Sequence, residues 1–302
     1  MNKNYQKIIS ILGKNRVRVD EPMAKHTTFK IGGPADLFYE ARTEEELVRV
    51  VRAVREMGVS YFILGNGSNL LVGDRGIRGM VIKIQNAKVK KQNDNSKFKI
   101  LADAGALLAE VVNFATKNSL GGLEFLTGIP GSVGGAVRGN AGAWQKTISG
   151  QVTKVKILSP DGKIKFLNQK DCQFSYRQSR FKKTEELILE IELEVEKKDK
   201  GEIEKLIEEY TYKRSHQPKE ASAGSIFINP KPYVAGEMID RCGLKGKKIG
   251  RAQISPKHAN FIVNLGGAKA TDVVALINLA REKVKEKFGI ELKEEIVRVG
   301  EF

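Results

Sequence analysis

Cysteine and histidine are scarce in this chain of 302 residues, and no long apolar run occurs. The two cysteines, Cys172 and Cys242, lie far apart, which excludes a small disulfide-bonded scaffold and favours a reducing, cytoplasmic setting. The three histidines are dispersed, without a cysteine or carboxylate pair at ligand spacing, so we expect no metal site. Because no stretch of about 18 apolar residues is present, and polar residues interrupt the N-terminal apolar stretch, we expect neither a membrane span nor a targeting segment.

Two common nucleotide-binding fingerprints are also missing from the sequence. No segment reads GxxxxGK followed by Ser or Thr, which excludes a P-loop, and no GxGxxG stands between a predicted strand and a predicted helix. A dinucleotide bound by this chain would therefore need an architecture other than the Rossmann fold.

Acidic residues are outnumbered by basic ones, with 36 Asp and Glu against 52 Lys and Arg and a formal net charge of +16. Such a charge attracts anions, from RNA to a nucleotide-linked sugar. The basic residues are spread along the whole chain and mixed with glutamates, and no RNP-like run, zinc finger or basic zipper occurs. A nucleic-acid-binding protein is therefore a second class of function that the charge allows and the motifs do not support.

The periodicity of apolar residues predicts three small units of mixed helices and strands, at residues 1–86, 87–199 and 200–302. We expect helices at these places: up to Gly13, Thr43 to Gly58, Leu107 to Lys117, Glu202 to Lys213, Val234 to Cys242, and Thr271 to Phe288. We expect strands at these places: Ala35 to Ala41, Tyr61 to Leu64, Lys88 to Lys91, Phe98 to Ala102, Val152 to Leu158, Lys163 to Leu167, Leu187 to Val195, Phe261 to Asn264, and Ile290 to Val299. A turn is expected at Asn93 to Asn95 and a loop at Ser215 to Pro232.

Two glycine-rich segments are suited to a phosphate-bearing ligand. Gly65 to Asn69 directly follows a predicted strand, and Thr127 to Ala143 has too many glycines for a core element and too few charges for a solvated linker. Glycine permits positive φ and a close approach of the backbone, and successive amides can surround an anion. Each segment taken alone is more typical of an ordinary tight turn, because glycine turns are common.

The ordered set of motifs in this chain resembles the UDP-N-acetylenolpyruvoylglucosamine reductase (MurB) family, in its shorter second type. The motifs follow the family's order from about residue 20 to the end of the chain. They are His26 to Gly33, Gly65 to Asn69, Gly128 to Gly135, Asn140 to Gly142, Phe174 to Phe181, Ala223 to Pro230, Ser255 to Asn264, and Glu294 to Gly300.

The resemblance implies an α+β chain with a vanillyl-alcohol-oxidase-type (PCMH-type) FAD-binding fold. Residues 1–86 and 87–199 would be its two FAD-binding subdomains, and residues 200–302 a C-terminal α+β substrate-binding domain. FAD would be held non-covalently, since Gly65 to Asn69 contains no histidine that could link it.

The activity implied is that of an NADPH-dependent, FAD-containing oxidoreductase, UDP-N-acetylmuramate dehydrogenase. It reduces UDP-N-acetylglucosamine enolpyruvate to UDP-N-acetylmuramate in cytoplasmic peptidoglycan synthesis, and so serves cell wall biogenesis, cell shape and cell division. Its partners would be the UDP-linked amino sugar and NADPH, with no nucleic acid, no membrane and a monomeric state. Another oxidase or dehydrogenase on the same flavin scaffold is the remaining alternative.

Three catalytic roles follow from the resemblance. Arg177 would hold the substrate carboxylate, because a guanidinium forms two parallel hydrogen bonds and keeps its charge. Ser225 would donate a proton to C2 of the substrate. Glu295 would polarise the carboxylate, although from its pattern alone it could belong to a solvated edge strand. Nearby Arg180 is expected to be structural.

The binding residues are carried over in the same way. Those implied for FAD are Gly65, Asn66, Gly67, Ser68, Asn69, Thr127, Gly128, Gly131, Ser132, Gly134, Gly135, Asn140 and Gly142. Those implied for the substrate are Tyr176, Arg214 and Asn229. Trp144 and Gln145 depart from the family's usual Tyr-Gly, in a turn beside the flavin, where we expect only packing to change.

Overall fold

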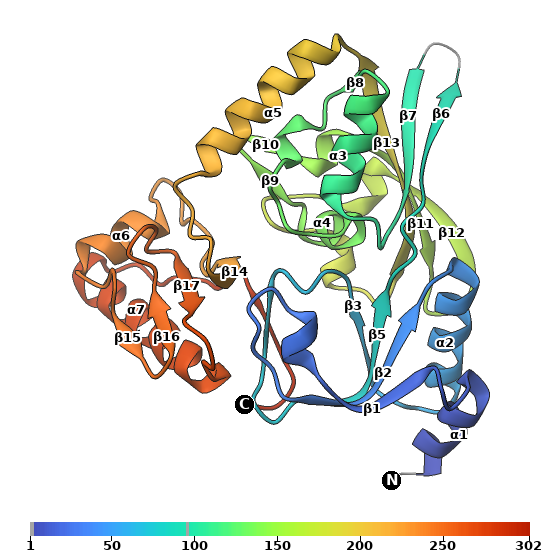
Figure 1. The fold of residues 1–302 in the computed structure, drawn as a ribbon, viewed down its shortest axis with the longest axis horizontal. Coiled ribbons are helices and arrows are strands. Elements are labelled where there is room, and N and C mark those ends of the chain that lie inside the picture. The colour runs from blue at the N-terminus through green and yellow to red at the C-terminus, as the bar shows by residue number, and fades with distance from the viewer. Residues whose placement is uncertain (1–2, 95–96) are drawn as a thin grey trace.

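Three β-sheets of four or more strands, each with helices packed beside it, follow one another along the described chain, as Figure 1 shows. The structure is a computed structural model that describes residues 3–94 and 97–302. Within these residues no helix is long and apolar enough to cross a membrane.

The first sheet is four-stranded, in the order β1-β2-β5-β3, and its last three strands run parallel. Its elements are α1 (Lys3–Leu12), β1 (Val17–Pro22), β2 (Pro34–Ala41), α2 (Glu44–Glu56), β3 (Tyr61–Leu64), β4 (Leu70–Val72) and β5 (Ile77–Ile84). The hydroxyl of Thr43 accepts a hydrogen bond from the Glu46 amide and so begins α2 as predicted. Strand β5, at the centre of the sheet, was not predicted.

The second sheet is antiparallel, in the order β12-β11-β13-β7-β6, with β8 added to β13. Its unit contains β6 (Val89–Asp94), β7 (Lys97–Asp103), α3 (Leu108–Lys117), β8 (Leu120–Gly121), α4 (Val133–Gly139), β9 (Gly142–Ala143), β10 (Lys146–Thr147), β11 (Val152–Leu158), β12 (Ile164–Asn168) and β13 (Leu187–Lys197). The predicted turn at 93–95 is wrong for Asn93 and Asp94, which belong to β6, whereas Asn95 lies outside the described residues.

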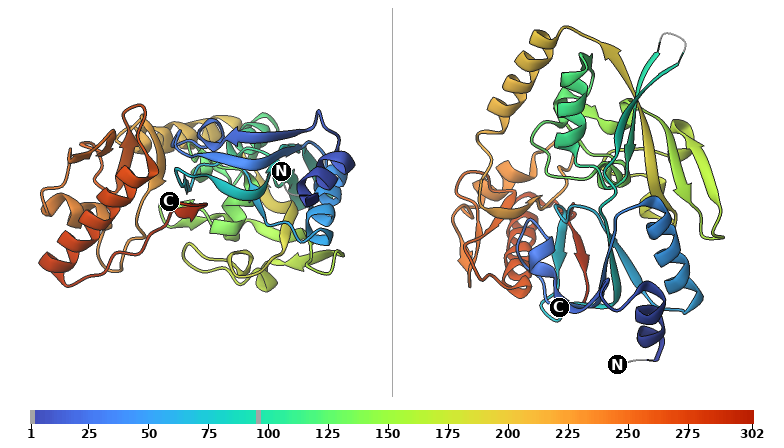
Figure 2. Two further views of the ribbon diagram at one scale, coloured as in Figure 1. Left: turned by 90° about the horizontal axis from the view of Figure 1, so that it is seen from below. Right: turned by 45° about the vertical axis from the view of Figure 1, so that its right-hand side comes forward.

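The third sheet has the order β14-β17-β16-β15 and is covered by α7, against which α6 packs. The elements of this part are α5 (Lys200–Arg214), β14 (Ala221–Ser225), α6 (Ala235–Arg241), β15 (Lys248–Ile249), β16 (Ala252–Ile254), β17 (Phe261–Asn264), α7 (Ala270–Phe288) and β18 (Val297–Val299). In Figure 2 the residues from β14 to α7 form a lobe of their own, with α7 running along it, whereas α5 lies against the second unit.

Four sequence predictions are corrected by this arrangement. The segment 215–232, predicted as a loop, contains strand β14. The helix predicted from Thr271 begins at Ala270, because the Asp272 carboxylate accepts a hydrogen bond from the Lys269 amide. The strand predicted over 290–299 is confined to β18, since the residues before it bond to different partners. The glycine-rich segment does contain a buried element, the helix α4.

The hydrophobic cores show which parts of the chain are joined. One core combines buried residues of the first and second units, from Ile8 to Val195, with Tyr210 of α5. A second core belongs to the C-terminal lobe but also takes in Phe29, Ile31 and Leu71 from the first unit. Strand β18 then returns to the first unit and pairs in parallel with β4. The lobe is therefore joined to the first unit by this shared core and by the pairing of β18 with β4.

Candidate functional site

The structure brings the two glycine-rich segments into contact. The Asn66 side chain donates a hydrogen bond to the carbonyl of Pro130 at 2.9 Å. A Cβ placed on Gly65 would lie only 2.4 Å from the Ser132 hydroxyl, so the two backbones could not approach in this way with a larger residue. Segments far apart in sequence therefore form one surface, as predicted for a ligand bound between the first two units.

The first of these segments leaves backbone donors free. In the described part of the chain, no backbone hydrogen bond uses the amides of Asn66, Gly67 and Ser68. Gly67 has φ of 65°, and a Cβ there would lie 2.1 Å from the His26 carbonyl oxygen, so this tight turn requires glycine. Successive free amides in such a turn form a concave binding site for an anion.

Helix α4, by contrast, begins with its donors already used. The amides of Val133 and Gly134 donate to the carbonyls of Ala106 and Ala104, both at 2.8 Å. The Gly135 amide donates to the hydroxyl of Ser132, the N-cap residue, at 3.3 Å. The segment at 65–69, rather than the start of this helix, therefore offers the donors for a phosphate.

Arg177 and Glu295 meet at the centre of the site. Arg177 Nε lies 2.8 Å from Glu295 Oε1, so the two side chains form an ion pair. Arg177 Nη2 donates to the carbonyl of Gly142 at 3.0 Å. Arg177 also has φ of 57°, a left-handed conformation that costs a non-glycine residue about 1 kcal/mol or more. Strain of this kind persists only where neighbouring contacts hold the residue in place.

Further cations surround this pair. Lys182 Nζ donates to the Arg177 carbonyl at 2.8 Å, and the guanidinium of Arg138 donates to the carbonyl of Phe181. Burial lowers the pKa of the Lys182 ammonium, and Glu295 opposes that shift. Burial raises the pKa of the Glu295 carboxyl above its usual value, and Arg177 and Lys182 only partly offset this. Several cationic side chains therefore surround one carboxyl group, Glu295, whose protonated form is favoured by burial.

Ser225 lies beside this pair, at the end of β14. The next residue, Ile226, accepts a hydrogen bond through its carbonyl from the Glu295 amide at 2.8 Å. Asn69, in the first glycine-rich segment, donates from its side chain to the Glu295 carbonyl at 3.1 Å. The three residues predicted to be catalytic, from three different segments, are therefore gathered next to the predicted FAD loops.

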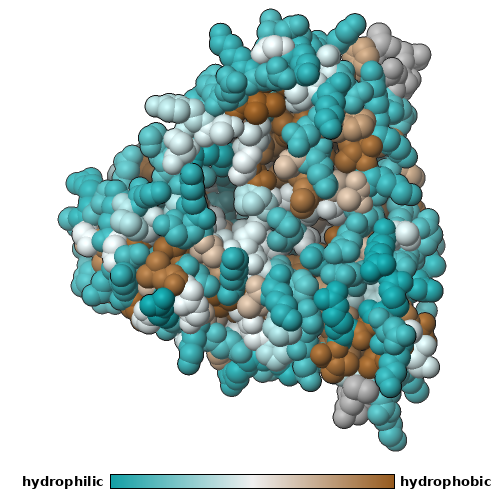
Figure 3. Space-filling model, viewed as in Figure 1, coloured by the Kyte–Doolittle hydropathy of each residue, from teal (hydrophilic) through white to brown (hydrophobic). Residues whose placement is uncertain are grey.

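The predicted substrate residues lie at different places around this centre. Tyr176 is exposed, and the guanidinium of Arg177 lies 5.3 Å from the centre of its ring. The Asn229 side-chain oxygen accepts from the Ala235 amide at 3.0 Å and so supports the start of α6. Arg214 lies against the second glycine-rich segment, where its Nε donates to the Thr127 carbonyl at 2.7 Å. Figure 3 shows a hollow near the middle of this face, between the C-terminal lobe and the rest of the molecule.

Two buried polar atoms beside Gly128 are available to bind a ligand. Among the residues described, neither Thr127 Oγ1 nor Arg214 Nη2 has a hydrogen-bond partner. A buried polar group without a partner costs about 1–3 kcal/mol, so a ligand or an ordered water that bonds to these two atoms would be stabilised. A flavin nucleotide, with its phosphates and ring carbonyls, supplies acceptors for these donors and for the amides at 66–68. The residues present therefore fit this group.

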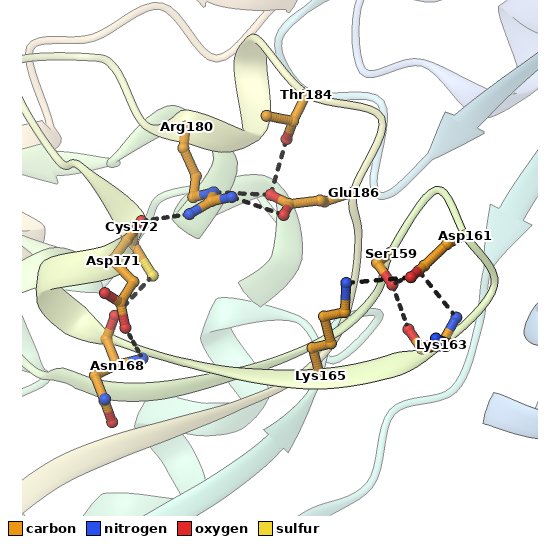
Figure 4. A network of polar contacts seen from close by, with 10 residues as sticks. All are labelled: Ser159, Asp161, Lys163, Lys165, Asn168, Asp171, Cys172, Arg180, Thr184 and Glu186. Atoms are coloured by element: carbon orange, nitrogen blue, oxygen red, sulfur yellow. Dashed lines mark hydrogen bonds and ion pairs between the residues drawn. The ribbon is translucent and has the colours of Figure 1, made fainter.

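Arg180 is held in a separate network, drawn in Figure 4. Its guanidinium bonds to both carboxylate oxygens of Glu186, at 2.8 and 2.9 Å, and to the Asp171 carbonyl at 3.0 Å. These contacts occupy its donors, as expected for a structural residue. Arg298 is similarly engaged, with Glu294.

The histidines take part in local packing. His26 Nε2 lies 2.9 Å from Glu21, and the His258 ring packs on Phe261 and accepts a hydrogen bond from the Asn260 amide. No group of three or more potential metal ligands occurs in residues 3–94 and 97–302.

The sequence analysis missed Lys182 and Arg138, which add charge to the site. Lys182 stands one residue beyond the motif that ends at Phe181, so the motif itself could have pointed to it. Arg138 offered no signal, because only the fold of α4 brings it near Phe181.

The comparisons with known proteins agree with this geometry. Residues 35–168 match an FAD binding domain, and residues 217–299 match the UDP-N-acetylenolpyruvoylglucosamine reductase C-terminal domain. The chain is 44% identical to the UDP-N-acetylenolpyruvoylglucosamine reductase of Clostridium botulinum strain 657, over 96% of this chain and 95% of that one. It is 41% identical to the enzyme of the same name from Caldanaerobacter subterraneus, over 98% of this chain and 97% of that one.

A comparison with solved structures also finds a UDP-N-acetylenolpyruvylglucosamine reductase. The crystal structure of UDP-N-acetylenolpyruvylglucosamine reductase (MurB) from Thermus caldophilus matches with a TM-score of 0.80 and 35% identity, covering 94% of this chain and 99% of that one. An alkyldihydroxyacetonephosphate synthase matches with a TM-score of 0.50 and 16% identity, over 65% of this chain and 40% of that one, a likeness of fold alone.

The fold and the site define an FAD-containing oxidoreductase, built from a PCMH-type FAD-binding fold and a C-terminal domain. More particularly, the chain belongs to the UDP-N-acetylenolpyruvoylglucosamine reductase (MurB) family, whose activity serves peptidoglycan precursor synthesis. The predicted family, fold class and flavin cofactor are thereby confirmed.

Proposed function

We propose that Arg177, Ser225 and Glu295 carry out the reduction of UDP-N-acetylglucosamine enolpyruvate to UDP-N-acetylmuramate with NADPH as hydride donor. The observation that carries this proposal is the 2.8 Å ion pair of Arg177 with Glu295, beside the end of the strand that bears Ser225. Reduction of the double bond adds a hydride at C3 and a proton at C2. When bound, FAD supplies the hydride chemistry, since it accepts a hydride from NADPH and passes it to the substrate.

The cationic residues stabilise the charge that develops on the substrate. After hydride addition, negative charge spreads over C2 and the attached carboxylate. Arg177 binds that carboxylate, and Lys182 supports Arg177 through its backbone carbonyl. A preorganised charge of this kind typically contributes about 10²–10³ in rate.

Ser225 and Glu295 supply and control protons. Ser225 gives its hydroxyl proton to C2, which a weak acid can do because the neighbouring carbanion is a far stronger base. Glu295, whose pKa is raised by burial, polarises the substrate carboxylate as a neutral acid or through a water. These groups lie on segments that the fold fixes, so the substrate meets them already oriented.

The proposal extends to the surrounding residues and units. Residues 1–86 and 87–199 bind FAD non-covalently, and residues 200–302 bind the UDP-linked sugar. The proposed FAD contacts are Gly65, Asn66, Gly67, Ser68, Asn69, Thr127, Gly128, Gly131, Ser132, Gly134, Gly135, Asn140 and Gly142. The proposed substrate contacts are Tyr176, Arg214 and Asn229.

We further propose that the protein acts as a monomer in the cytoplasm. Support comes from its two free cysteines, which a reducing compartment preserves. Its substrate and NADPH are also both intracellular compounds, and neither nucleic acid nor a membrane has a part in the reaction.

An anaerobic experiment on the two half-reactions tests the proposal. NADPH should bleach the bound flavin, and the enolpyruvyl sugar should then restore its colour. Arg177→Ala should leave bleaching nearly intact and slow the return of colour by about 10²–10³. Arg180→Ala is the control, because it removes the other arginine of the same motif. In folded protein it should change neither bleaching nor the return of colour. If colour does not return in the wild-type protein, the assignment of the substrate is wrong.

A further inference from the structure

The turn between β9 and β10 has an unusual backbone. Its two central residues, Trp144 and Gln145, both have positive φ, at 48° and 64°. A two-residue hairpin turn with positive φ at both positions normally contains Asn and Gly. A residue with a larger side chain pays roughly 1–2 kcal/mol for this conformation. Some interaction of these side chains must therefore offset the strain.

Trp144 makes such an interaction and exposed Gln145 does not. The indole ring stacks on Tyr210 of α5, with ring centres 5.0 Å apart and planes 28° apart. The Arg214 guanidinium, at the end of α5, lies 4.7 Å from the indole centre. Cation–π contacts of this kind contribute about 0.5–2 kcal/mol, more where water is excluded. The strained turn thus places an aromatic surface directly under Arg214.

Arg214 is held on its other side by the second glycine-rich segment. Its Nε donates to the Thr127 carbonyl at 2.7 Å. Gly128 has φ of 74°, and a Cβ there would lie 2.7 Å from Arg214 Cδ. The Arg214 side chain therefore packs directly against the backbone of this turn, at a position that requires glycine. Arg214 Nη1 faces the Gln217 side chain at 3.5 Å. Of the three guanidinium nitrogens of Arg214, Nη2 is the one that is buried and has no hydrogen-bond partner in residues 3–94 and 97–302.

We propose that Trp144 is a positioning residue that fixes Arg214 above the Thr127–Gly128 turn, so that Arg214 Nη2 binds an oxygen of the flavin nucleotide. This inference rests on the FAD site proposed above and gives Arg214 a role beside its contact with the substrate. The indole and the Thr127 carbonyl hold the guanidinium from two sides. Its free donor is therefore presented before the ligand arrives, which reduces the entropy lost on binding.

Substitutions at the two turn positions separate this role from the stability of the turn. Asn tolerates positive φ, so Trp144→Asn keeps the turn and removes the ring. Gln145→Asn makes the matched change at the neighbouring position and keeps the ring. Arg214→Met removes the guanidinium but keeps a long side chain.

The first measurements are the dissociation constant of FAD from refolded apoprotein and the reduction potential of the bound flavin. Arg214→Met should raise the dissociation constant about tenfold or more, since a charge-assisted hydrogen bond is lost. Trp144→Asn should shift the same quantity in the same direction, and Gln145→Asn should match the wild type. A more negative potential in Arg214→Met places the oxygen on the flavin ring, with a tenfold loss of stabilisation of the reduced form equal to about 30 mV. An unchanged potential with weaker FAD binding places it on the pyrophosphate.

The double variant Trp144→Asn/Arg214→Met shows whether the ring acts through Arg214. If it does, the double variant should bind FAD no more weakly than Arg214→Met alone. Additive losses, or FAD binding by Trp144→Asn equal to that of Gln145→Asn, would overturn the inference. If the wild-type protein itself binds no FAD, the proposed function fails instead, so the two failures are distinguishable.

Discussion

Glu295 is a half-buried carboxyl group whose proton equilibrium is shifted by folding. Burial raises its pKa above the usual 4.5 despite the attraction of Arg177 and Lys182. In the pH window just above 4.5, Glu295 therefore keeps its proton in the native state, whereas the unfolded chain has already lost it. Because the native state binds more protons there, stability falls as pH rises through that window.

Glu295→Gln cannot lose a proton and should escape this fall. Its free energy of unfolding should decline less than that of the wild type as pH rises from below 4.5 through the window. Denaturant unfolding at a series of pH values measures the difference. Glu291→Gln, at an exposed position nearby, should follow the wild type. Parallel curves for wild type and Glu295→Gln would show that Glu295 titrates normally.

Ser225 offers a test of proton donation against packing. Ser225→Ala removes one oxygen and little volume, so fold and FAD content should persist. Turnover of the enolpyruvyl sugar should fall by about 10² or more, because a positioned acid contributes roughly 10²–10⁴. Ser225→Cys retains a transferable proton and should recover part of the loss. Stopped-flow reoxidation of the flavin gives the rates, and near-normal turnover in the alanine variant would remove Ser225 from the mechanism.

The sequence identifies these residues by motif and not by geometry. Arg177 is one of many basic residues, and Glu295 sits in a segment that reads as an edge strand. Their ion pair joins distant parts of the chain, and only the return of the last residues to the first unit creates it. The untested roles of Arg177, Ser225 and Glu295 therefore stay predictions, although their proximity supports them.

At the scale of elements, local propensity explains both successes and errors. Helix α2 has a capping residue and a regular apolar face, so its start and core positions are readable from sequence. Strand β14 consists of small residues without β-branching, and its pairing with β17 decides its conformation. Helix α4 contains three glycines and forms because neighbouring carbonyls bind its first amides and Gly134 packs closely on Ala104. Tertiary contacts override propensity in both cases.

Gly131, in the second glycine-rich segment, is a position where an added side chain should prevent FAD binding without disturbing the fold. A Cβ on Gly131 would meet Leu108 and Ser68 at 3.6 and 3.7 Å, which are ordinary contacts. Gly131→Val should therefore fold but occupy space needed by FAD, and the purified protein should be colourless. Gly139→Val, where nothing lies within 4 Å of the new Cβ, is the matched control and should stay yellow.

Flavin absorbance relative to protein absorbance measures this loss, and circular dichroism checks the fold. Full flavin content in Gly131→Val would contradict the place given to FAD. In the wild type, acid precipitation should release all flavin into the supernatant, as a non-covalent site requires. Colour that remains in the pellet would indicate a covalent link.

At the scale of the whole molecule, several contacts attach the C-terminal lobe to the first unit, and two of them involve β4 and the residue that follows it closely. One is the pairing of β18 with β4. The other is Asp74, which follows β4 and accepts hydrogen bonds from the amides of Ala270 and Thr271 at 2.7 and 3.1 Å, at the start of α7. The carboxylate also accepts from the Thr271 hydroxyl at 3.0 Å. A side chain of the first unit thus caps the longest helix of the lobe, and its negative charge interacts favourably with the positive end of the helix dipole.

Asp74→Ala should loosen the lobe without disturbing the FAD loops. Loss of a capping side chain costs about 0.5–2 kcal/mol, so the free energy of unfolding should fall by that amount while flavin content stays unchanged. The KM for the UDP-linked sugar should rise, because the lobe carries the proposed substrate contact Asn229, while the rate of flavin reduction by NADPH should persist. Asp74→Asn keeps one acceptor oxygen and should show a smaller loss. Denaturant unfolding and steady-state kinetics measure both effects, and an alanine variant with wild-type stability and KM would show that the lobe is held in place without Asp74.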